Sequence, residues 1–172
     1  MKPTTYILIL LSLFLISNCG DKVREEITER YDDEQKKVLV GYKGKGSDEE
    51  IVKRIEYYKN GEISLEGNYK DGEKDRKWTL YYSNGQKWRE ENYKGGKLDG
   101  KWTKYYENGQ KSNEKNYKDG KKDGKWIDYW ENGQILWDGN YKDGEKDGKW
   151  TFYSDDGRII KVVEYKDGEL AK

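Results

Sequence analysis

A 24-residue repeat governs what this chain can form. Asparagine–glycine pairs recur at that spacing, and one aspartate–glycine pair continues the series. The pairs are Asn60-Gly61, Asn84-Gly85, Asn108-Gly109, Asn132-Gly133 and Asp156-Gly157. Tryptophan keeps the same step from Trp78 to Trp150, and tyrosine keeps it from Tyr69 to Tyr165. A period of this length is typical of repeat proteins, in which each unit packs mainly against its two neighbours.

The repeat predicts one β-hairpin per unit. Asn-Gly between alternating aromatic segments is a strong hairpin signal, because both residues tolerate the positive φ of a type I′ turn. Folding about Asn108-Gly109 pairs Tyr105 with Ser112 and Trp102 with Lys115. We therefore predict an all-β fold, an elongated single-layer antiparallel meander of 24-residue β-hairpin repeats.

The second turn of each unit is expected to bring a tyrosine over glycines. If residues 119–122 form a four-residue return loop, Tyr117 lies opposite Gly124 on one side and opposite Gly100 on the other. An aromatic ring that covers a bare glycine stabilises the neighbouring strands of a sheet.

Alternation along the strands separates two faces of the sheet. One face carries the tryptophans, the Tyr117 series and the glycines, and we expect it to be the buried side. The other face carries a column of tyrosines beside a column of carboxylates, which is the candidate partner-binding strip. The strip comprises Tyr57, Tyr81, Tyr105, Tyr129, Tyr153, Glu66, Glu90, Glu114 and Asp138. It either binds a partner through its rings and carboxylates, or only stabilises the sheet through cross-strand pairs in solvent.

The N-terminus has the pattern of a secretory signal over residues 1–18. The apolar run from Tyr6 to Ile16 is too short to span a bilayer, which needs about 20 residues. It leads to Cys19, the only cysteine in the sequence. This arrangement resembles the lipobox of bacterial lipoproteins, in which such a cysteine becomes the lipidated first residue. Asn18 stands where that pattern has alanine or glycine.

After the signal, we expect residues 19–30 to form a tether or an edge segment and residues 31–172 to form the repeat domain. An upstream copy with Gln35 and Tyr42 at the spacing of Gln86 and Tyr93 brings the number of copies to about six. Charges within residues 20–34 and 164–172 are expected to discourage end-to-end pairing of sheets.

Composition excludes several classes of function. Lysine plus arginine and aspartate plus glutamate each number 34, so no bulk field attracts nucleic acid. The absence of histidine removes imidazole catalysis and histidine-ligated metal. Catalysis needs a unique site, whereas this chain repeats the same side chains. We therefore expect no enzyme, no cofactor and no metal.

The repeat unit from Lys101 to Gly124 reads KWTKYYENGQKSNEKNYKDGKKDG. Its Tyr-Tyr-x-Asn-Gly and Asn-Tyr-x-x-Gly-x-x-x-Gly-x-Trp signatures resemble the MORN repeat variant found in bacterial proteins, over about residues 23–168. Chains of this kind are often labelled antitoxin components of the YwqK family. The resemblance implies hairpin repeats, which serve many roles.

Together these features predict a bacterial lipoprotein in the cell envelope, anchored in a membrane through Cys19 and facing the periplasm or the exterior. It would act as a non-catalytic binding or scaffold module for an unknown protein partner. Two alternatives remain open. The family label implies neutralisation of a toxin by binding, and the exposed rings of the tyrosine strip suggest lipid or glycan binding.

Overall fold

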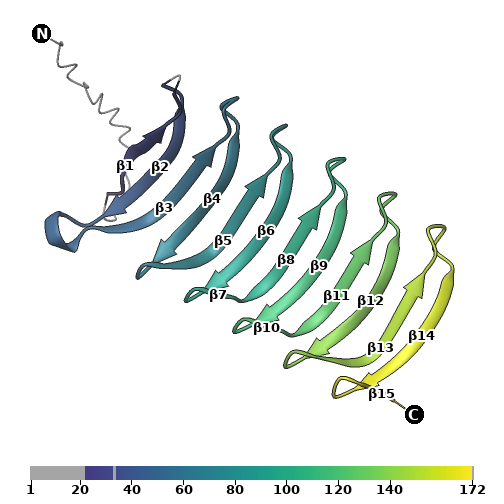
Figure 1. The fold of residues 1–172 in the computed structure, drawn as a ribbon. Coiled ribbons are helices and arrows are strands. Elements are labelled where there is room, and N and C mark those ends of the chain that lie inside the picture. The colour runs from purple at the N-terminus through teal and green to yellow at the C-terminus, as the bar shows by residue number, and fades with distance from the viewer. Residues whose placement is uncertain (1–21, 33, 172) are drawn as a thin grey trace, which may run out of the picture.

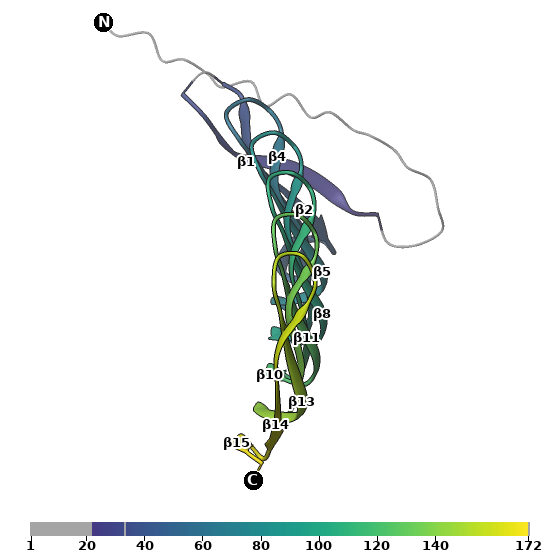
Figure 2. The same cartoon turned by 90° about the vertical axis from the view of Figure 1, so that its right-hand side faces the viewer.

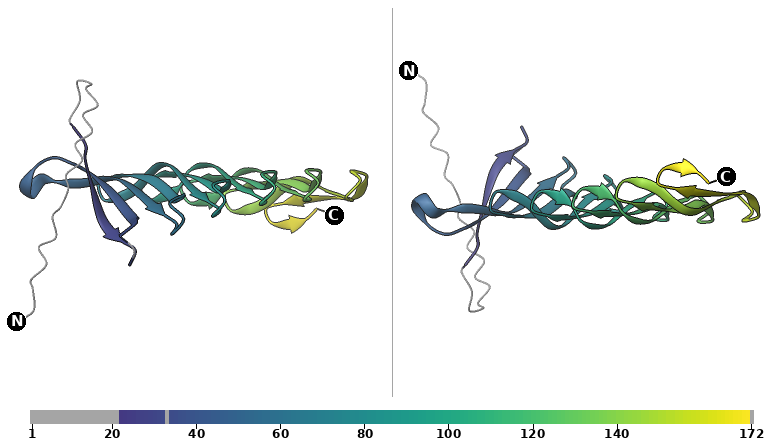
Figure 3. Two further views of the ribbon diagram at one scale, coloured as in Figure 1. Left: turned by 90° about the horizontal axis from the view of Figure 1, so that it is seen from above. Right: turned by 90° about the horizontal axis from the view of Figure 1, so that it is seen from below.

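The computed structural model describes residues 22–32 and 34–171, which form one open antiparallel β-sheet of 15 strands (Figure 1). The sheet is a meander, because sequential strands lie side by side along its whole length. Edge-on views show a long sheet that is one layer thick (Figures 2 and 3). The all-β meander predicted from the repeat is confirmed. The signal segment 1–18 and Cys19 lie outside the described residues.

The strands comprise twelve of six to nine residues and three of two residues at the return turns. They are β1 (Arg24–Arg30), β2 (Lys36–Lys43), β3 (Glu50–Tyr57), β4 (Ile63–Lys70), β5 (Glu73–Tyr81), β6 (Lys87–Lys94), β7 (Lys97–Leu98), β8 (Gly100–Tyr105), β9 (Lys111–Lys118), β10 (Lys121–Lys122), β11 (Gly124–Tyr129), β12 (Ile135–Lys142), β13 (Glu145–Tyr153), β14 (Ile159–Lys166) and β15 (Glu169–Leu170). A 3₁₀ turn, η1 (Gly46–Asp48), lies between β2 and β3. Within residues 22–32 and 34–171, no helix is long and apolar enough to cross a bilayer.

The Asn-Gly turns are three-residue loops, so the predicted two-residue type I′ turn is wrong. The N–H of Tyr106 donates to Gln110 O (2.8 Å), and only Gly109 has a positive φ, of 83°. This is a turn that closes with a glycine bulge. This turn is favoured because Asn108 keeps a negative φ and its side chain makes two hydrogen bonds. Its Oδ1 accepts the Gln110 N–H (2.9 Å), and its Nδ2 donates to Glu131 O of the next repeat (3.1 Å).

The longer loop changes the register at one end of each hairpin. Trp102 faces Lys115 as predicted. The predicted pairing of Tyr105 with Ser112 is wrong, because Tyr105 faces Lys111 and a bulge leaves Ser112 as the extra residue. The bulge lies at the turn end of the hairpin and does not shift the pairs in its middle. The two faces of the sheet therefore carry the residues that the alternation predicted.

The return turns are tighter than the predicted four-residue loop. Asp119 and Gly120 have φ values of 49° and 84°, which is the type I′ pattern. The hairpin therefore closes early, and Tyr117 faces Lys122 instead of Gly124, while Gly100 faces it on the other side as expected. The two residues gained form a bulge at which Gly124 takes a φ of 93°.

Tryptophans cover glycines on the buried side, which we call the tryptophan face. Trp78 and Trp150 are each 2% exposed. A Cβ atom at Gly67 would lie 2.1 Å from the Trp78 ring, and one at Gly139 would lie 2.2 Å from the Trp150 ring. Gly67 and Gly139 are therefore needed to make space for a tryptophan ring, whereas Gly100 and Gly124 face Tyr117 and Tyr141 on the neighbouring strands.

Candidate binding surface on the tyrosine face

The candidate strip lies on the face opposite the tryptophans, which we call the tyrosine face. Each tyrosine hydroxyl of the strip after the first donates to the carboxylate that lies 15 residues earlier, in the preceding repeat. The pairs are Tyr81 with Glu66 (2.5 Å), Tyr105 with Glu90 (2.7 Å), Tyr129 with Glu114 (3.1 Å) and Tyr153 with Asp138 (3.1 Å). Tyr57 differs, since its ring lies 5.0 Å from the Lys36 ammonium. The structure thus joins strip residues of successive repeats into a ladder.

Lysines complete the ladder on its other side. The Nζ atoms of Lys101 and Lys111 lie 2.8 and 2.5 Å from Glu114 Oε1. Lys77 and Lys87 pair with Glu90 in the same way. Lys125 lies 3.5 Å from Asp138. Each of these carboxylates therefore binds a hydroxyl from one neighbour and at least one ammonium group from another.

This environment holds the central carboxyl groups in the charged form. Burial alone would raise the pKa of Glu90, but hydrogen bonds from Lys77, Lys87 and Tyr105 outweigh it and lower the pKa to about 2. Glu114 behaves alike, since burial is outweighed by Lys101 and Lys111 and its pKa also falls to about 2. Both groups are thus anionic over the whole physiological range.

The tyrosines of the ladder are held in the neutral form. Burial and the hydrogen bond to Glu66 raise the pKa of Tyr81 to about 12. Burial and the charge of Glu114 raise the pKa of Tyr129 to about 12. These hydroxyls therefore remain donors to the carboxylates and are unsuited to act as bases at neutral pH.

The remaining polar groups of this face also bond within the sheet. Asn92 Nδ2 donates to Lys101 O (2.5 Å), and Asn116 Nδ2 donates to Lys125 O (2.6 Å). Thr79 and Thr103 are each only 4% exposed beneath the ladder. The central part of the tyrosine face is therefore a stabilising cross-strand network, and its role in partner binding stays a prediction.

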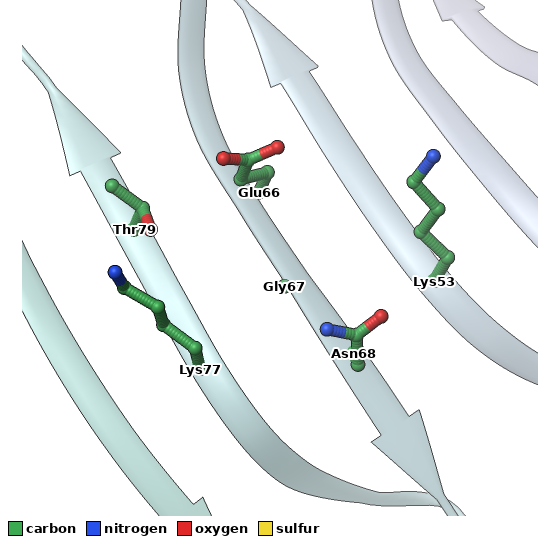
Figure 4. A pocket seen from close by; sticks show the side chains of 6 residues that line it. All are labelled: Lys53, Glu66, Gly67, Asn68, Lys77 and Thr79. Carbon is green, nitrogen blue, oxygen red and sulfur yellow. The ribbon is translucent and has the colours of Figure 1, made fainter.

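The ladder is least complete in the second repeat. Ile63 occupies the position that Lys87 and Lys111 hold in later repeats, and Lys53 pairs with Glu25 (3.0 Å). A shallow pocket lies here, with side chains from β3, β4 and β5 pointing to one face (Figure 4). It is lined by Lys53, Glu66, Gly67, Asn68, Lys77 and Thr79.

One structurally important carboxylate escaped the sequence analysis. Glu91 is 6% exposed on the tryptophan face, where it accepts Trp102 Nε1–H (3.1 Å) and the Tyr93 hydroxyl (2.9 Å). Arg89 completes the group at 3.0 Å. The signal was available in the repeat, because Glu91 stands where Gly67 and Gly139 stand in other copies.

The tryptophan face presents cations over its rings. Lys115 Nζ lies 4.8 and 4.9 Å from the ring centroids of Trp102 and Trp126, and Lys122 Nζ lies 4.7 Å from those of Trp126 and Tyr141. Such contacts shield the rings with the lysine stems and keep the ammonium groups near water. The face is therefore closed by its own side chains rather than left open as a stacking platform.

Comparison with known proteins agrees with this repeated geometry. The family model described as MORN repeat variant matches five segments of the chain, residues 52–71, 77–94, 98–119, 122–143 and 146–167. Each segment covers a hairpin or its return turn. Among curated proteins, none matches the chain significantly.

Proposed function

The chain belongs to the MORN repeat variant family, whose repeats are generally non-catalytic protein- or membrane-binding modules, and we propose that it is a membrane-anchored bacterial lipoprotein that binds a protein partner. Cys19 would carry the lipid, and the sheet would act as a scaffold in the cell envelope, facing the periplasm or the exterior. The single observation that carries this proposal is the repetition of one side-chain network along an extended sheet.

Repetition favours binding over catalysis for a physical reason. Tyrosine–carboxylate pairs recur from repeat to repeat, and their pKa shifts hold the tyrosines neutral and the central glutamates charged. A catalytic site needs groups whose protonation can change near the working pH. An extended sheet with fixed charges instead suits contact with a large partner.

The position of the first strand supports an anchor at Cys19. β1 begins at Arg24, five residues later, and five extended residues span at most about 18 Å. A lipid at Cys19 would therefore hold the N-terminal edge of the sheet close to the bilayer. Two or three acyl chains on one cysteine are enough for stable attachment.

Metabolic labelling tests the anchor. Labelled palmitate is expected to enter the wild-type chain in a bacterial host and to fractionate with membranes. Cys19→Ala should lose both label and membrane association, while Cys19→Ala protein purified from the soluble fraction keeps the β-sheet circular dichroism of the wild type. A full-length, unlabelled wild-type product in the soluble fraction would refute the lipoprotein part of the proposal.

A further inference from the structure

The C-terminal end of the sheet carries the most exposed isoleucine and leucine side chains among the described residues. Ile159, Ile160 and Val162 of β14 are 61%, 68% and 47% exposed. The equivalent residues of β12, 24 positions earlier, are half-buried. The charges of residues 164–172 lie beyond this apolar part of the strand, so their expected effect on end-to-end pairing stays a prediction.

The internal repeats show what covers a strand of this kind. β12 is paired on its outer side by β13, which sets Phe152 against Trp137 and Thr151 against Asp138. β4 is covered by β5 in the same way. On β14, only the last three residues have an outer neighbour, because β15 pairs with Tyr165 and Lys166 and the Ala171 N–H donates to Glu164 O (2.9 Å). The rest of the outer edge, Ile159–Val163, is unpaired by any described strand.

The open edge also offers a packing site for a tryptophan ring beside Val163 and Tyr165, which we call the ring seat. Three tryptophans pack on the tyrosine of the repeat before them: Trp78 on Tyr69 (5.1 Å), Trp126 on Tyr117 (5.5 Å) and Trp150 on Tyr141 (5.2 Å). Tyr165 is the last tyrosine of this series, and only Trp150, from its own hairpin, lies against it (5.9 Å) among the described rings.

Lys161 stands beside this seat where Arg89 stands beside Trp102. Arg89 lies 5.9 Å from the centroid of the Trp102 ring. A cation in the same place at the C-terminal edge would lie over an incoming indole.

The opposite end of the sheet does not fit this edge. β1 has the sequence REEITER, and its charges pair internally, for example Arg24 with Glu49 (2.9 Å) and Lys37 with Glu29 (3.0 Å). It has no tryptophan. End-to-end pairing of β14 with β1 of another copy would desolvate these charges without filling the ring seat.

We propose that the outer edge of Ile159–Val163 binds a partner protein by β-strand addition. The partner supplies an extended strand, antiparallel to β14, with a tryptophan that enters the seat beside Val163 and Tyr165. Backbone hydrogen bonds give affinity in this mode of recognition, and the ring gives specificity. This inference rests on the proposed binding function and assigns it a surface, at the end of the sheet farthest from Cys19 in sequence.

A peptide of residues 100–118 is the probe, because it spans the β8–β9 hairpin and carries Trp102 on its first strand. Fluorescence anisotropy with the purified full chain is expected to show saturable binding. Val162→Lys and Ile160→Lys should each weaken it roughly tenfold, which corresponds to about 1.4 kcal/mol. Ile51→Lys, at a comparably exposed apolar site on β3, is the matched control and should bind as the wild type does.

Three outcomes would overturn the inference. They are equal affinity of wild-type and Val162→Lys protein, equal affinity of a Trp102→Ala peptide, and a chain that dimerises through this edge and excludes the peptide. Melting curves of each variant establish that it is folded. Palmitate labelling is independent of the edge, so failure of peptide binding would refute the docking surface and leave the membrane anchor standing.

Discussion

At the residue scale, four successive repeats have a left-handed backbone conformation near the start of their first long strand. Gly100, Gly124 and Gly148 occupy this position with φ values of 96°, 93° and 71°. In the hairpin of β5 and β6, Arg76 occupies it, with a φ of 59°. A residue with a Cβ atom is strained in this region, by roughly 1–2 kcal/mol, whereas glycine is not.

Arg76→Gly is therefore expected to raise the free energy of unfolding by about 1 kcal/mol. The side chain is 83% exposed and its contact with Asp75 is long, at 3.7 Å, so little is lost with it. Urea unfolding followed by tryptophan fluorescence measures the change. Gly148→Arg is the reciprocal control and should destabilise, because open space surrounds Gly148 and only its backbone resists the substitution.

Glycine serves a different purpose at Gly139, where the tryptophan ring leaves no room for a methyl group. Gly139→Ala should displace Trp150 and lower stability by about 1–3 kcal/mol through overpacking. The indole emission should shift as the ring becomes more exposed. Gly41→Ala is the comparison, because its nearest neighbour is Lys53 Cβ at 3.0 Å. Equal effects of the two substitutions would contradict the stacking of Trp150 over Gly139.

At the scale of the element, tyrosine hydroxyls tie each hairpin to the next. The Tyr58 hydroxyl donates to Tyr81 O (2.6 Å), and the Tyr106 hydroxyl donates to Tyr129 O (2.6 Å). The first hairpin is joined in the same manner, by Tyr31 to Tyr57 O (2.7 Å). The series is interrupted at Trp130, whose buried Nε1 has no hydrogen-bond partner in the described part of the chain.

Trp130→Tyr should therefore stabilise the protein by about 1 kcal/mol, since a hydroxyl there can reach the carbonyl of Tyr153 and an unpaired buried donor is removed. Thermal melting monitors the change. Tyr106→Phe is the paired control and should destabilise by a similar amount. A lower melting temperature for Trp130→Tyr would show that the larger indole packs too well to be replaced.

The carboxylate ladder gives the sheet a defined pH dependence. Glu90 and Glu114 have pKa values of about 2 in the folded chain, below the ordinary value of 4.5. Their contribution is present above pH 4.5 and is lost as the pH falls towards about 2, because protons then favour the unfolded chain. Urea midpoints should fall over this range. The double variant Glu90→Gln/Glu114→Gln should be less stable at neutral pH and should show a flatter dependence.

The positions of the strands could be predicted from the sequence, because the alternation of side chains and the 24-residue period are both visible in it. The pairing of Trp102 with Lys115 followed from counting outward from the turn. The turn types did not follow, because Asn-Gly and Asp-Gly both permit a type I′ turn. Contacts with the adjacent repeat favour the observed forms, such as Asn108 to Glu131 O and the N–H of Asp119 to Asp99 Oδ2 (3.1 Å).

The candidate strip was predictable as a surface and not as a network. The column of tyrosines and carboxylates followed from the period, but the hydroxyl-to-carboxylate bonds depend on how far each ring reaches across the neighbouring strand. Glu91 was missed because a carboxylate on a ring-rich face is expected to be excluded, whereas Arg89 and two aromatic donors satisfy it there.

At the scale of the whole molecule, the sheet has no separate core. Its buried residues lie between adjacent hairpins, and strand contacts connect only sequential neighbours along the meander. Stability in such a protein is approximately a sum of unit and nearest-neighbour terms. A complete repeat can therefore be removed without disturbing the register of the others, whereas part of a repeat cannot.

Deletion of residues 101–124 tests this most directly, because it joins Gly100 to Lys125 and so reproduces the natural Gly124–Lys125 junction. We expect a shorter folded protein with an unchanged β-sheet circular dichroism per residue and cooperative unfolding. Its free energy of unfolding should be lower by the contribution of one repeat and its interface. Deletion of residues 101–112 removes half a unit and should leave the C-terminal hairpins unfolded. If the 24-residue deletion is as disordered as the half-unit deletion, the repeat is not the structural unit of this chain.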